Sequence, residues 1–289
     1  MRILLAIVHH WNPQGGGQHQ SLRANPQPRI EALQQQLLCL RRLGRGQSML
    51  HMQDRAVYPA NDAFRHSIDV KLITDGEHHV LDRLPESYQG CFEHVATQPA
   101  HSKLLGFEAQ KVLANALPED YDLYGYLEDD LLIHDPCFFQ KIQWFSGLMG
   151  PQCLLLPQRL EFSPVPHRVD RFYIDGPIAE DDLRPLVPQA GPVRLVQWAG
   201  TQIPFEPPLN PHAGCYFLSH GQLSHWVEQP WWQDGDTSFI SPLESAATLG
   251  IAKSFELFKP CLSHAAWLEV QHYGTSFHCL IGTPVEMTG

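Results

Sequence analysis

The sequence predicts an α/β fold built on a sheet whose strands pair largely in parallel. Within residues 1–135, apolar segments of strand length alternate with amphipathic segments of helical length, in the order strand, helix, strand, strand, helix, strand. This rhythm is typical of sheets in which crossover helices join parallel strands. The chain has 289 residues, of which 43% are hydrophobic, so it can bury the core of one large domain.

Local signals mark each element of this first part of the chain. Arg2–Val8 is almost continuously apolar, as expected of a buried first strand. Pro28 begins a helix whose apolar residues recur at helical spacing, and Gly44 ends it. The other elements expected here are strands at 68–74 and 91–96 and a helix at 99–117, which Pro118 ends.

The most informative segment is the strand expected at 121–130. Leucine and glycine alternate with tyrosine along it, which fits a pleated surface, and it ends in Glu128, Asp129 and Asp130. The end of such a strand lies at the rim of the sheet, where ligands of open α/β sheets bind. Three adjacent carboxylates repel one another unless a divalent metal or strong hydrogen-bond donors neutralise them. Ligation by oxygen alone favours Mg²⁺ or Mn²⁺.

The rest of the chain changes character. Asp135 and Pro136 are expected to start a helix that runs to about Leu148, with Asp135 as its N-cap, and a strand follows at 152–157. Between 162 and 211 the chain is irregular and rich in proline, yet it keeps aromatic and apolar residues. We therefore expect strands and long loops built over the first part, and not a flexible linker.

Composition excludes several classes of protein. The formal net charge of −11 argues against a broad surface for nucleic acid or anionic membranes. The opening apolar run of about six residues is far shorter than the roughly twenty that a membrane helix needs, and no signal-peptide pattern follows it. We expect no integral membrane segment and a cytoplasmic location. The seven cysteines include no C-x-x-C pair, which argues against a zinc ribbon or a disulfide framework.

The strand with the acidic end resembles that of GT-A glycosyltransferases, whose Asp-x-Asp motif ends a central strand and holds a divalent metal on a nucleotide-sugar diphosphate. Glu128 stands in place of the first Asp, a variant that also occurs in this superfamily. The resemblance implies Asp130 as a direct metal ligand and Glu128 as a contact to metal-bound water or to the ribose, with Asp129 in the same binding set. The bland alternative is a solvated strand end.

The resemblance further implies an α/β fold of GT-A type, with a Rossmann-like mixed sheet, in a single domain over 1–289. Residues 1–135 would form the nucleotide-sugar-binding half and 136–289 the acceptor-binding half. His9, Asn12 and Asp75 follow the first two strands, where the family holds base and ribose. Asp75 precedes a glycine, so it fits an ordinary turn equally well.

Many GT-A enzymes add a late histidine to the metal, and the order of residues makes His272 the best candidate for that role, before His264 and His278. Neutral imidazole suits Mn²⁺. A lone histidine also has an ordinary structural interpretation. The chain contains seventeen histidines, so most of them must be surface residues or satisfied core residues.

The segment from Pro211 to His220 is similar to the glycine-rich segment, strand and Ser-started helix of GT-A acceptor sites. Gly214 would let the backbone approach the sugar closely. The alternative is an ordinary strand whose Ser219 caps the next helix. Trp231 and Trp232 are expected to present an aromatic face to a pyranose ring in the acceptor cleft, whereas core packing explains Trp198 better.

GT-A enzymes often carry their general base in or just before the first turn of a late helix. Two residues fit this description, Glu244 and Asp236. Glu244 lies three residues after Ser241, with Pro242 between them, and a capping box would occupy it structurally. Asp236 lies in a loop that is free to face a cleft, and the sequence leaves both candidates open.

The leading hypothesis is a metal-dependent glycosyltransferase of the hexosyl- or N-acetylhexosaminyl-transferase class. It would use Mn²⁺ or Mg²⁺, a nucleotide-diphosphate sugar as donor, and a carbohydrate or other hydroxyl as acceptor. One alternative is a nucleotidyltransferase, which usually has a basic loop after the first strand, whereas here the nearest arginine is Arg23. Another is a non-catalytic sugar-binding protein of the same fold.

Overall fold

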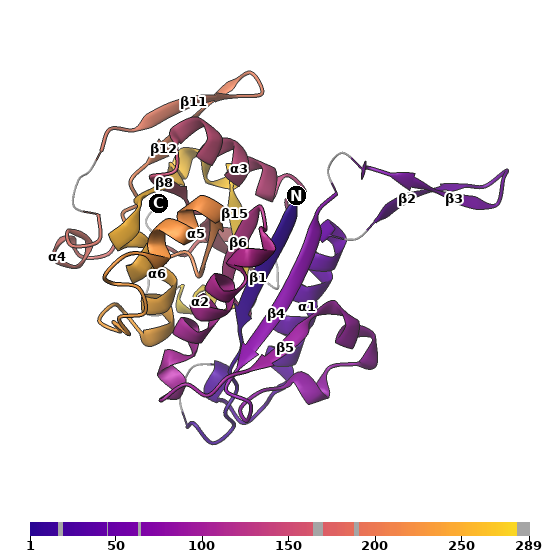
Figure 1. The fold of residues 1–289 in the computed structure, drawn as a ribbon, viewed down its shortest axis with the longest axis horizontal. Coiled ribbons are helices and arrows are strands. Elements are labelled where there is room, and N and C mark those ends of the chain that lie inside the picture. The colour runs from indigo at the N-terminus through magenta and orange to yellow at the C-terminus, as the bar shows by residue number, and fades with distance from the viewer. Residues whose placement is uncertain (17–19, 45, 63–64, 164–169, 188–190, 282–289) are drawn as a thin grey trace.

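A five-stranded sheet forms the centre of the protein, which is described here by a computed structural model (Figure 1). The structure describes the chain apart from residues 17–19, 45, 63–64, 164–169, 188–190 and 282–289. Along the sheet the strands follow the order β13-β6-β1-β4-β5. Their bounds are Arg2–Val8 for β1, Ser67–Thr74 for β4, Glu93–Ala96 for β5, Leu123–Glu128 for β6 and Cys215–Ser219 for β13.

The pairing of these strands creates a switch point in the sheet. β1 pairs in parallel with β4 on one side and with β6 on the other, and β5 extends the parallel set beyond β4. The chain therefore leaves β1 first toward β4 and β5, and later returns to the opposite side at β6. Ligands of open α/β sheets bind outside the carboxyl ends of the strands at such a reversal. β13 pairs antiparallel with β6, which makes the sheet mixed.

Helices cover both faces of the sheet. Ile3, Leu5 and Ile7 of β1 point into a core shared with α1 and α3, whereas the alternate residues of β1 point into a second core shared with α2, α5 and α6. The helices are α1 at Gln27–Gly44, α2 at Leu105–Asn115, α3 at Phe138–Met149, α4 at Glu180–Leu183, α5 at His220–Val227 and α6 at Pro242–Ser254. No helix in the described ranges combines the length and the apolar character that a membrane crossing requires.

Two smaller sheets extend the molecule. One has the order β10-β9-β15-β7, with bounds Arg171–Tyr173, Gln158–Phe162, Glu269–His272 and Leu131–Leu132. The other has the order β11-β12-β14-β8, with bounds Arg194–Trp198, Thr201–Glu206, Glu256–Pro260 and Cys153–Leu155. Because β7 follows β6 after only two residues, the first of these sheets brings β9 and β15 next to the acidic end of β6.

A hairpin of β2 (Gln47–His51) and β3 (Ala56–Ala60) projects away from the body, as Figure 1 shows. It exposes several apolar side chains, namely Met49, Leu50, Met52 and Val57. The sequence analysis did not identify this hairpin. Short 3₁₀ turns complete the fold at Gln20–Leu22, Leu81–Arg83, Glu86–Cys91, Ser102–Leu104, Leu117–Glu119, Leu262–Trp267 and His278–Leu280.

Most predicted elements of the first 135 residues are confirmed, but the predicted starts of α2 and of α3, which follows them, are wrong. α3 begins at Phe138 and not at Asp135, because the Asp135 carboxylate accepts the amide of Cys137 at 2.8 Å and closes a turn before the helix. α2 begins at Leu105 and not near 99, since a separate 3₁₀ turn precedes it. The proline-rich stretch contains β10, α4, β11 and β12, although its residues 164–169 and 188–190 lie outside the described ranges.

Substituting alanine for Gly125 and for Gly147 should change the stability of the protein in opposite directions. A Cβ at Gly125 in β6 would lie 2.6 Å from Leu5 and 2.7 Å from Phe217, so Gly125→Ala should destabilise the protein by about 1–3 kcal/mol through overpacking. Gly147 in α3 has nothing within 4 Å of its Cβ position, and Gly147→Ala should stabilise by about 0.5–1 kcal/mol through helix propensity. Urea unfolding measures both variants. Equal effects would contradict this description of the core.

Candidate functional site

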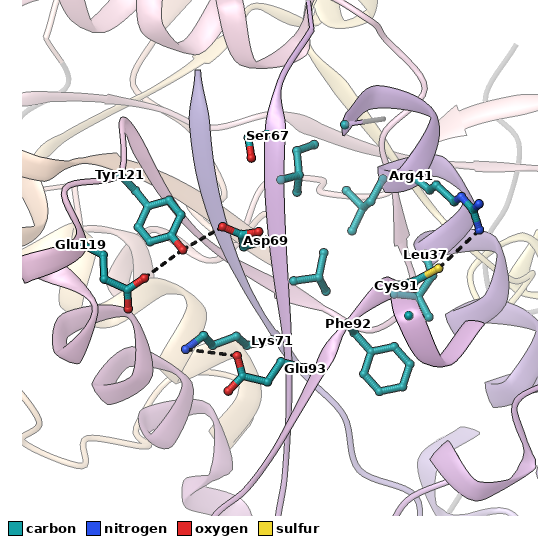
Figure 2. Close-up of a pocket in the computed structure, with 15 residues that line it drawn as sticks. Leu37, Arg41, Ser67, Asp69, Lys71, Cys91, Phe92, Glu93, Glu119 and Tyr121 are labelled. Atoms are coloured by element: carbon teal, nitrogen blue, oxygen red, sulfur yellow. Dashed lines mark hydrogen bonds and ion pairs between the residues drawn. The ribbon is translucent and has the colours of Figure 1, made fainter. Parts of the chain in front are cut away.

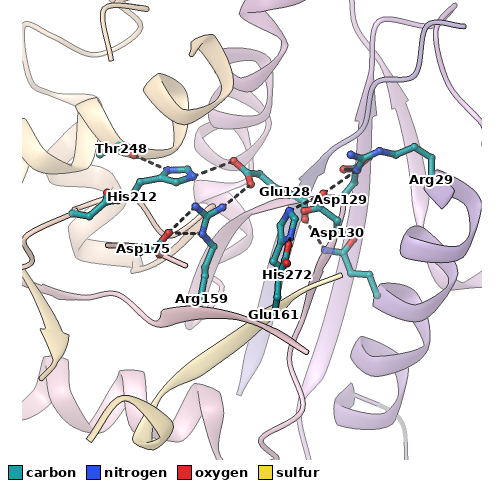
Figure 3. A network of polar contacts seen from close by, with 12 residues as sticks. Arg29, Glu128, Asp129, Asp130, Arg159, Glu161, Asp175, His212, Thr248 and His272 are labelled. Atoms are coloured by element: carbon teal, nitrogen blue, oxygen red, sulfur yellow. Dashed lines mark hydrogen bonds and ion pairs between the residues drawn. The ribbon is translucent and has the colours of Figure 1, made fainter. Parts of the chain in front are cut away.

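The acidic triplet lies at the switch point and is buried. Glu128 is the last residue of β6, Asp129 and Asp130 form the turn that follows, and each is only 7% exposed. The alternative of a solvated strand end is therefore excluded. Three buried carboxylates require compensation from cations and hydrogen-bond donors, and Figure 3 shows where that compensation comes from.

The negative charge of Asp129 is compensated by two residues from the first part of the chain. His9, at the end of β1, accepts the amide of Val80 at its Nε2 (3.1 Å), so its Nδ1 carries the proton and donates it to Asp129 at 2.6 Å. Arg29, in the first turn of α1, donates to the other oxygen of Asp129. Burial alone would raise the pKa of Asp129, but Arg29 and His9 outweigh it and lower that pKa. Asp129 is thus an ionised carboxylate with both oxygens engaged.

Asp130 keeps one oxygen without a partner. Its Oδ2 lies 3.2 Å from Arg29 Nη1 and 3.6 Å from His272 Nε2. Its Oδ1 is buried and has no hydrogen-bond partner among the described residues. The backbone oxygen of Asp130 accepts the amide of Tyr273 at 2.7 Å, which ties the acidic turn to the strand that carries His272.

The buried carboxylate of Glu161 orients the ring of His272. The Nδ1 of His272 donates to Glu161 at 2.9 Å, and Glu161, which is fully buried, also accepts the amides of Phe277 and His278. Burial opposes the charged imidazole, but Asp130 and Glu161 raise the pKa of His272. A histidine whose Nδ1 is held by a carboxylate and whose Nε2 faces another is arranged as metal-binding histidines are.

The side chain of Glu128 faces two residues from the later part of the chain, Arg159 and His212. Its oxygens lie 3.6 Å from Arg159 Nη1 and 3.6 Å from His212 Nε2. Burial raises the pKa of Glu128 to about 8, although Arg159 acts against this rise. Gly214, at φ +62°, lies directly against Glu128, because a Cβ there would be 2.7 Å from Glu128 Oε2. The close approach expected of Gly214 is therefore made to this carboxylate.

A second buried ion cluster supports Arg159. Arg159 donates to Asp175 at 3.0 and 2.7 Å, and Lys259 donates to Asp175 at 3.1 Å and to the backbone oxygen of His212 at 2.6 Å. Burial alone would raise the pKa of Asp175, but Arg159 and Lys259 lower it strongly. The cluster fixes Arg159 and His212 opposite Glu128.

Together these groups form one network, which we call the carboxylate network. Its members are Glu128, Asp129, Asp130, Glu161, Asp175, Arg29, Arg159, Lys259, His9, His212 and His272. Five carboxylates face three arginine or lysine cations in it. Since burial raises the pKa of Glu128 to about 8, that residue is largely protonated near pH 7, and the formal excess is one negative charge before the histidines are counted.

The donor set fits a divalent cation in part. Asp130 Oδ1 and Glu128 Oε1 are buried without hydrogen-bond partners, and His272 Nε2 faces Asp130. Glu128, Asp130 and His272 nevertheless do not converge into a cage. Among the described residues, only His10, Asp75 and His78 bring three possible ligand atoms within 4.8 Å of one another. Asp130 and His272 would be the two protein ligands of such an ion, and substrate phosphate and water would supply the others.

The two candidate bases differ in their surroundings. Glu244 is half-buried in the first turn of α6, and its Oε2 has no hydrogen-bond partner among the described residues. The capping box does not form, because the Ser241 side chain makes no cap bond; Ser245 donates to the backbone oxygen of Ser241. Asp236 accepts from Ser238 N and from Lys253 at 2.9 Å, and these contacts lower its pKa to about 2.

The predicted aromatic contacts pack against the core. Trp231 donates to Ser254 at 2.9 Å, and the ring of Trp232 meets that of Trp226 edge-on at 4.9 Å. Trp198 lies among other tryptophans, as core packing predicts. A sugar-binding role for Trp231 and Trp232 stays a prediction.

The predicted cap at Ser219 is confirmed, since Ser219 and Gln222 form a capping box.

The remaining predicted residues have local roles. The Asn12 side chain accepts the amide of Gln14, and Asp75 accepts the amides of Glu77 and His78, so both close turns. His264 contacts its neighbour Ser263, outside the carboxylate network, and His278 contributes its amide to Glu161. Contacts of His9, Asn12 and Asp75 with a nucleotide stay predictions.

Sequence reasoning singled out His9 and His272 but missed the arginine and lysine cations of the network and the carboxylate of Glu161. Arg159 and Glu161 alternate along β9 and therefore point to the same face. On an isolated strand, alternating charges suggest a solvent-facing surface, yet both residues are buried. Arg29 looked like an ordinary polar residue in the first turn of a helix. One weak indication of its role was its positive charge, because a cation near a helix N-terminus interacts unfavourably with the helix dipole.

A pocket of about 610 Å³ lies elsewhere, beside the N-terminal half of β4 (Figure 2). It is lined by α1, by residues 67–71 of β4 and by residues 90–93, and by none of the predicted site residues. The carboxyl end of β4 lies at Thr74, so this pocket is beside the opposite half of the strand. Its position does not match that of a ligand bound at the switch point.

Arg29 makes a testable contribution to stability. Arg29→Ala leaves two buried carboxylates without their cation and should destabilise the protein by about 3 kcal/mol at pH 7. Combining it with Asp129→Asn should cost less than the sum of the two single changes, because the charge left unpaired is then reduced. Urea unfolding of the four proteins of this cycle measures the coupling. Strict additivity would show that Arg29 does not act through Asp129.

Asp236 should contribute pH-dependent stability. Its folded pKa of about 2 lies below the ordinary value of 3.8, so the contribution is present above about pH 4 and is lost as pH falls toward 2. Because the side chain is partly exposed, solvent screening limits the effect to about 0.5 kcal/mol. Asp236→Asn should therefore be less stable than the parent chain at pH 7, with the gap closing in acid. A gap that is independent of pH contradicts this origin.

Comparisons with known proteins give distant structural neighbours. No protein-family model matches the sequence, and no curated protein matches it. The structure of S. aureus TarS 1-349 in complex with UDP is 10% identical, with a TM-score of 0.41, and the match covers 90% of this chain and 57% of that one. The chain thus spans less than two thirds of that protein.

Two further neighbours are similarly distant. Mannose-1-phosphate geranyltransferase from Thermus thermophilus is 11% identical, covering 90% of this chain and 73% of that one, with a TM-score of 0.39. CMP:2-keto-3-deoxy-manno-octonic acid synthetase complexed with CTP is 9% identical, covering 94% and 90%, with a TM-score of 0.36. At these scores none of the three fixes a family or a substrate, so the chemistry must be derived from the residues of this chain.

Proposed function

We propose that the chain is a glycosyltransferase dependent on a divalent metal. It would move a hexosyl or N-acetylhexosaminyl group from a nucleotide-diphosphate sugar to a hydroxyl acceptor. One observation carries the proposal: Asp130, buried at the switch point, keeps an oxygen without a partner and faces His272, which Glu161 holds from behind. The GT-A-like motif in the sequence points to the same residues.

Charge explains why a metal is needed. The carboxylate network has a formal excess of negative charge, and a diphosphate would add more, so the two repel one another unless a cation lies between them. Mn²⁺ or Mg²⁺, when bound, would neutralise the departing diphosphate. Asp130 and His272 would hold the ion, Arg29 fixes the orientation of Asp130, and Glu161 fixes that of His272.

Glu244 is the better candidate for the base. Its Oε2 is unpartnered, and its charge lies close enough to Glu128 to raise the pKa of that residue. In an inverting transfer the base would take the proton of the acceptor hydroxyl while that oxygen bonds to the anomeric carbon and the diphosphate leaves. Asp236 is less suited, because Lys253 and Ser238 occupy it and lower its basicity.

Binding of nucleoside diphosphates should depend on metal and on Asp130. Calorimetric titration with UDP, GDP, ADP and CDP, with and without Mn²⁺, should reveal at least one that binds only with metal. Asp130→Ala should weaken that binding at least about tenfold, as losing a metal contact does. Asp62→Ala, at an exposed position, is the matched control and should bind normally. Metal-independent binding, or binding unchanged in Asp130→Ala, contradicts the proposal.

Turnover should separate the two bases and the alternative functions. Glu244→Gln should slow donor hydrolysis by about 10²–10⁴-fold, the usual contribution of a general base, while Asp236→Asn should lose only a few-fold. The opposite order would assign the base to Asp236. Pyrophosphate release from a nucleoside triphosphate would instead indicate a nucleotidyltransferase. Binding of a sugar nucleotide with no turnover at all would indicate a non-catalytic binding protein.

A further inference from the structure

A second cluster of ligating side chains lies at the carboxyl ends of β1 and β4. It consists of His10, Asp75 and His78, whose possible ligand atoms all lie within 4.8 Å of one another. In the part of the chain that the structure describes, no other three histidine, cysteine or carboxylate side chains meet this distance. None of the three belongs to the carboxylate network, and no step of the proposed transfer uses them together.

Two imidazoles converge on one oxygen of Asp75. Asp75 Oδ2 lies 2.8 Å from His78 Nδ1 and 3.7 Å from His10 Nε2, and the centroids of the two rings are 5.5 Å apart. A tetrahedral ion with bonds of about 2.0–2.1 Å separates its ligand atoms by roughly 3.3 Å. The two separations from Asp75 lie on either side of this value, and all three ligand atoms lie within 4.8 Å of one another, so small side-chain rotations would bring them into contact with one ion.

The backbone preorganises Asp75 for this role. Its Oδ1 accepts the amides of Glu77 at 3.0 Å and His78 at 2.7 Å, which leaves Oδ2 directed at the two rings. Gly76 takes φ +84°, a conformation that the tight turn requires and that glycine adopts without strain. The side chains of His10, Asp75 and His78 are 22%, 12% and 39% exposed, so an ion can enter and a fourth position stays open to water.

We propose that His10, Asp75 and His78 form a second cation site, which binds a transition metal of the zinc type. Two imidazoles and one carboxylate suit Zn²⁺, whereas Mg²⁺ and Ca²⁺ prefer oxygen donors throughout. Binding replaces the hydrogen bond between His78 Nδ1 and Asp75: the Nδ1 proton is given up, and the ring, still neutral, carries its one proton on Nε2 instead. Three protein ligands with an open fourth position are the arrangement that catalytic zinc sites use.

The second site shares no residue with the carboxylate network, although the two are neighbours in the chain, and of its three residues only Asp75 is also expected to contact a nucleotide. His9, next to His10, donates to Asp129, and it accepts the amide of Val80 two residues after His78. The two sites therefore share the segments 9–10 and 78–80 but differ in donor type. A loss of one does not remove the ligands of the other.

Cobalt absorption tests the proposal on the full chain after treatment with a chelator. Co²⁺ should bind with one equivalent at this site and give visible absorption bands, which Zn²⁺ displaces and excess Mg²⁺ does not. His10→Gln and His78→Gln should each weaken this binding at least about tenfold. His51→Gln is the matched control, because His51 forms a similar pair with Asp54 at 3.1 Å but has no second histidine beside it. It should bind Co²⁺ as the parent chain does.

Two further variants keep the outcome unambiguous. His78→Cys should retain Co²⁺ and add a sulfur-to-cobalt charge-transfer band in the near ultraviolet, a gain that a merely unfolded variant does not produce. Asp130→Ala should leave the cobalt spectrum unchanged, which separates this site from the proposed transferase. The proposal is overturned if the parent chain shows no visible cobalt bands, if the bands survive both glutamine variants, or if folded His78→Cys shows no new band.

Discussion

The fold is organised around the burial of three consecutive carboxylates at the end of one strand. Removing a charge from water costs several kcal/mol unless a partner compensates it, so β6 can end in Glu128, Asp129 and Asp130 only where cations meet them. The groups that meet these carboxylates come from elements that are far apart in the sequence: the cations Arg29 from α1 and Arg159 from β9, and the imidazole of His272 from β15. The small sheet of β10, β9, β15 and β7 therefore has an electrostatic as well as a structural function, because it carries two of these groups to the end of β6.

The three carboxylates have different environments. These differences indicate which of them has a structural role and which can bind a ligand. Both oxygens of Asp129 are engaged by His9 and Arg29, so this residue joins α1 to the end of the sheet. Asp130 and Glu128 each keep a buried oxygen without a hydrogen bond. An unsatisfied buried acceptor is destabilising, and a ligand bound beside it can supply the missing partner. The location at the switch point between β1 and β6 is where such a ligand is expected to bind.

Local patterns in the sequence were sufficient for the elements whose stability is local. The apolar run of β1, the helical spacing of α1 and the alternation in β6 each report a buried face, and the structure confirms all three. The same patterns could not reveal the counter-charges, because Arg159 and Glu161 become buried only when β9 pairs with β15 across more than a hundred residues of chain. The capping motif at Ser241 also failed: the Ser241 side chain makes no cap bond, and Ser245 instead bonds the backbone of Phe239 and Ser241.

The two candidate cation sites also show how donor chemistry can separate ions within one sheet edge. Around Asp130 the free donors are mainly carboxylate oxygens, and the diphosphate of a donor sugar would add more oxygen, which suits Mg²⁺ or Mn²⁺. Around Asp75 two imidazoles outnumber the single carboxylate, which suits zinc. Arg29 strengthens this division, because its positive charge beside Asp130 weakens the attraction of that site for any cation that arrives without an anionic ligand. A metal at Asp130 would then bind most firmly together with its diphosphate, whereas the histidine site requires no such partner.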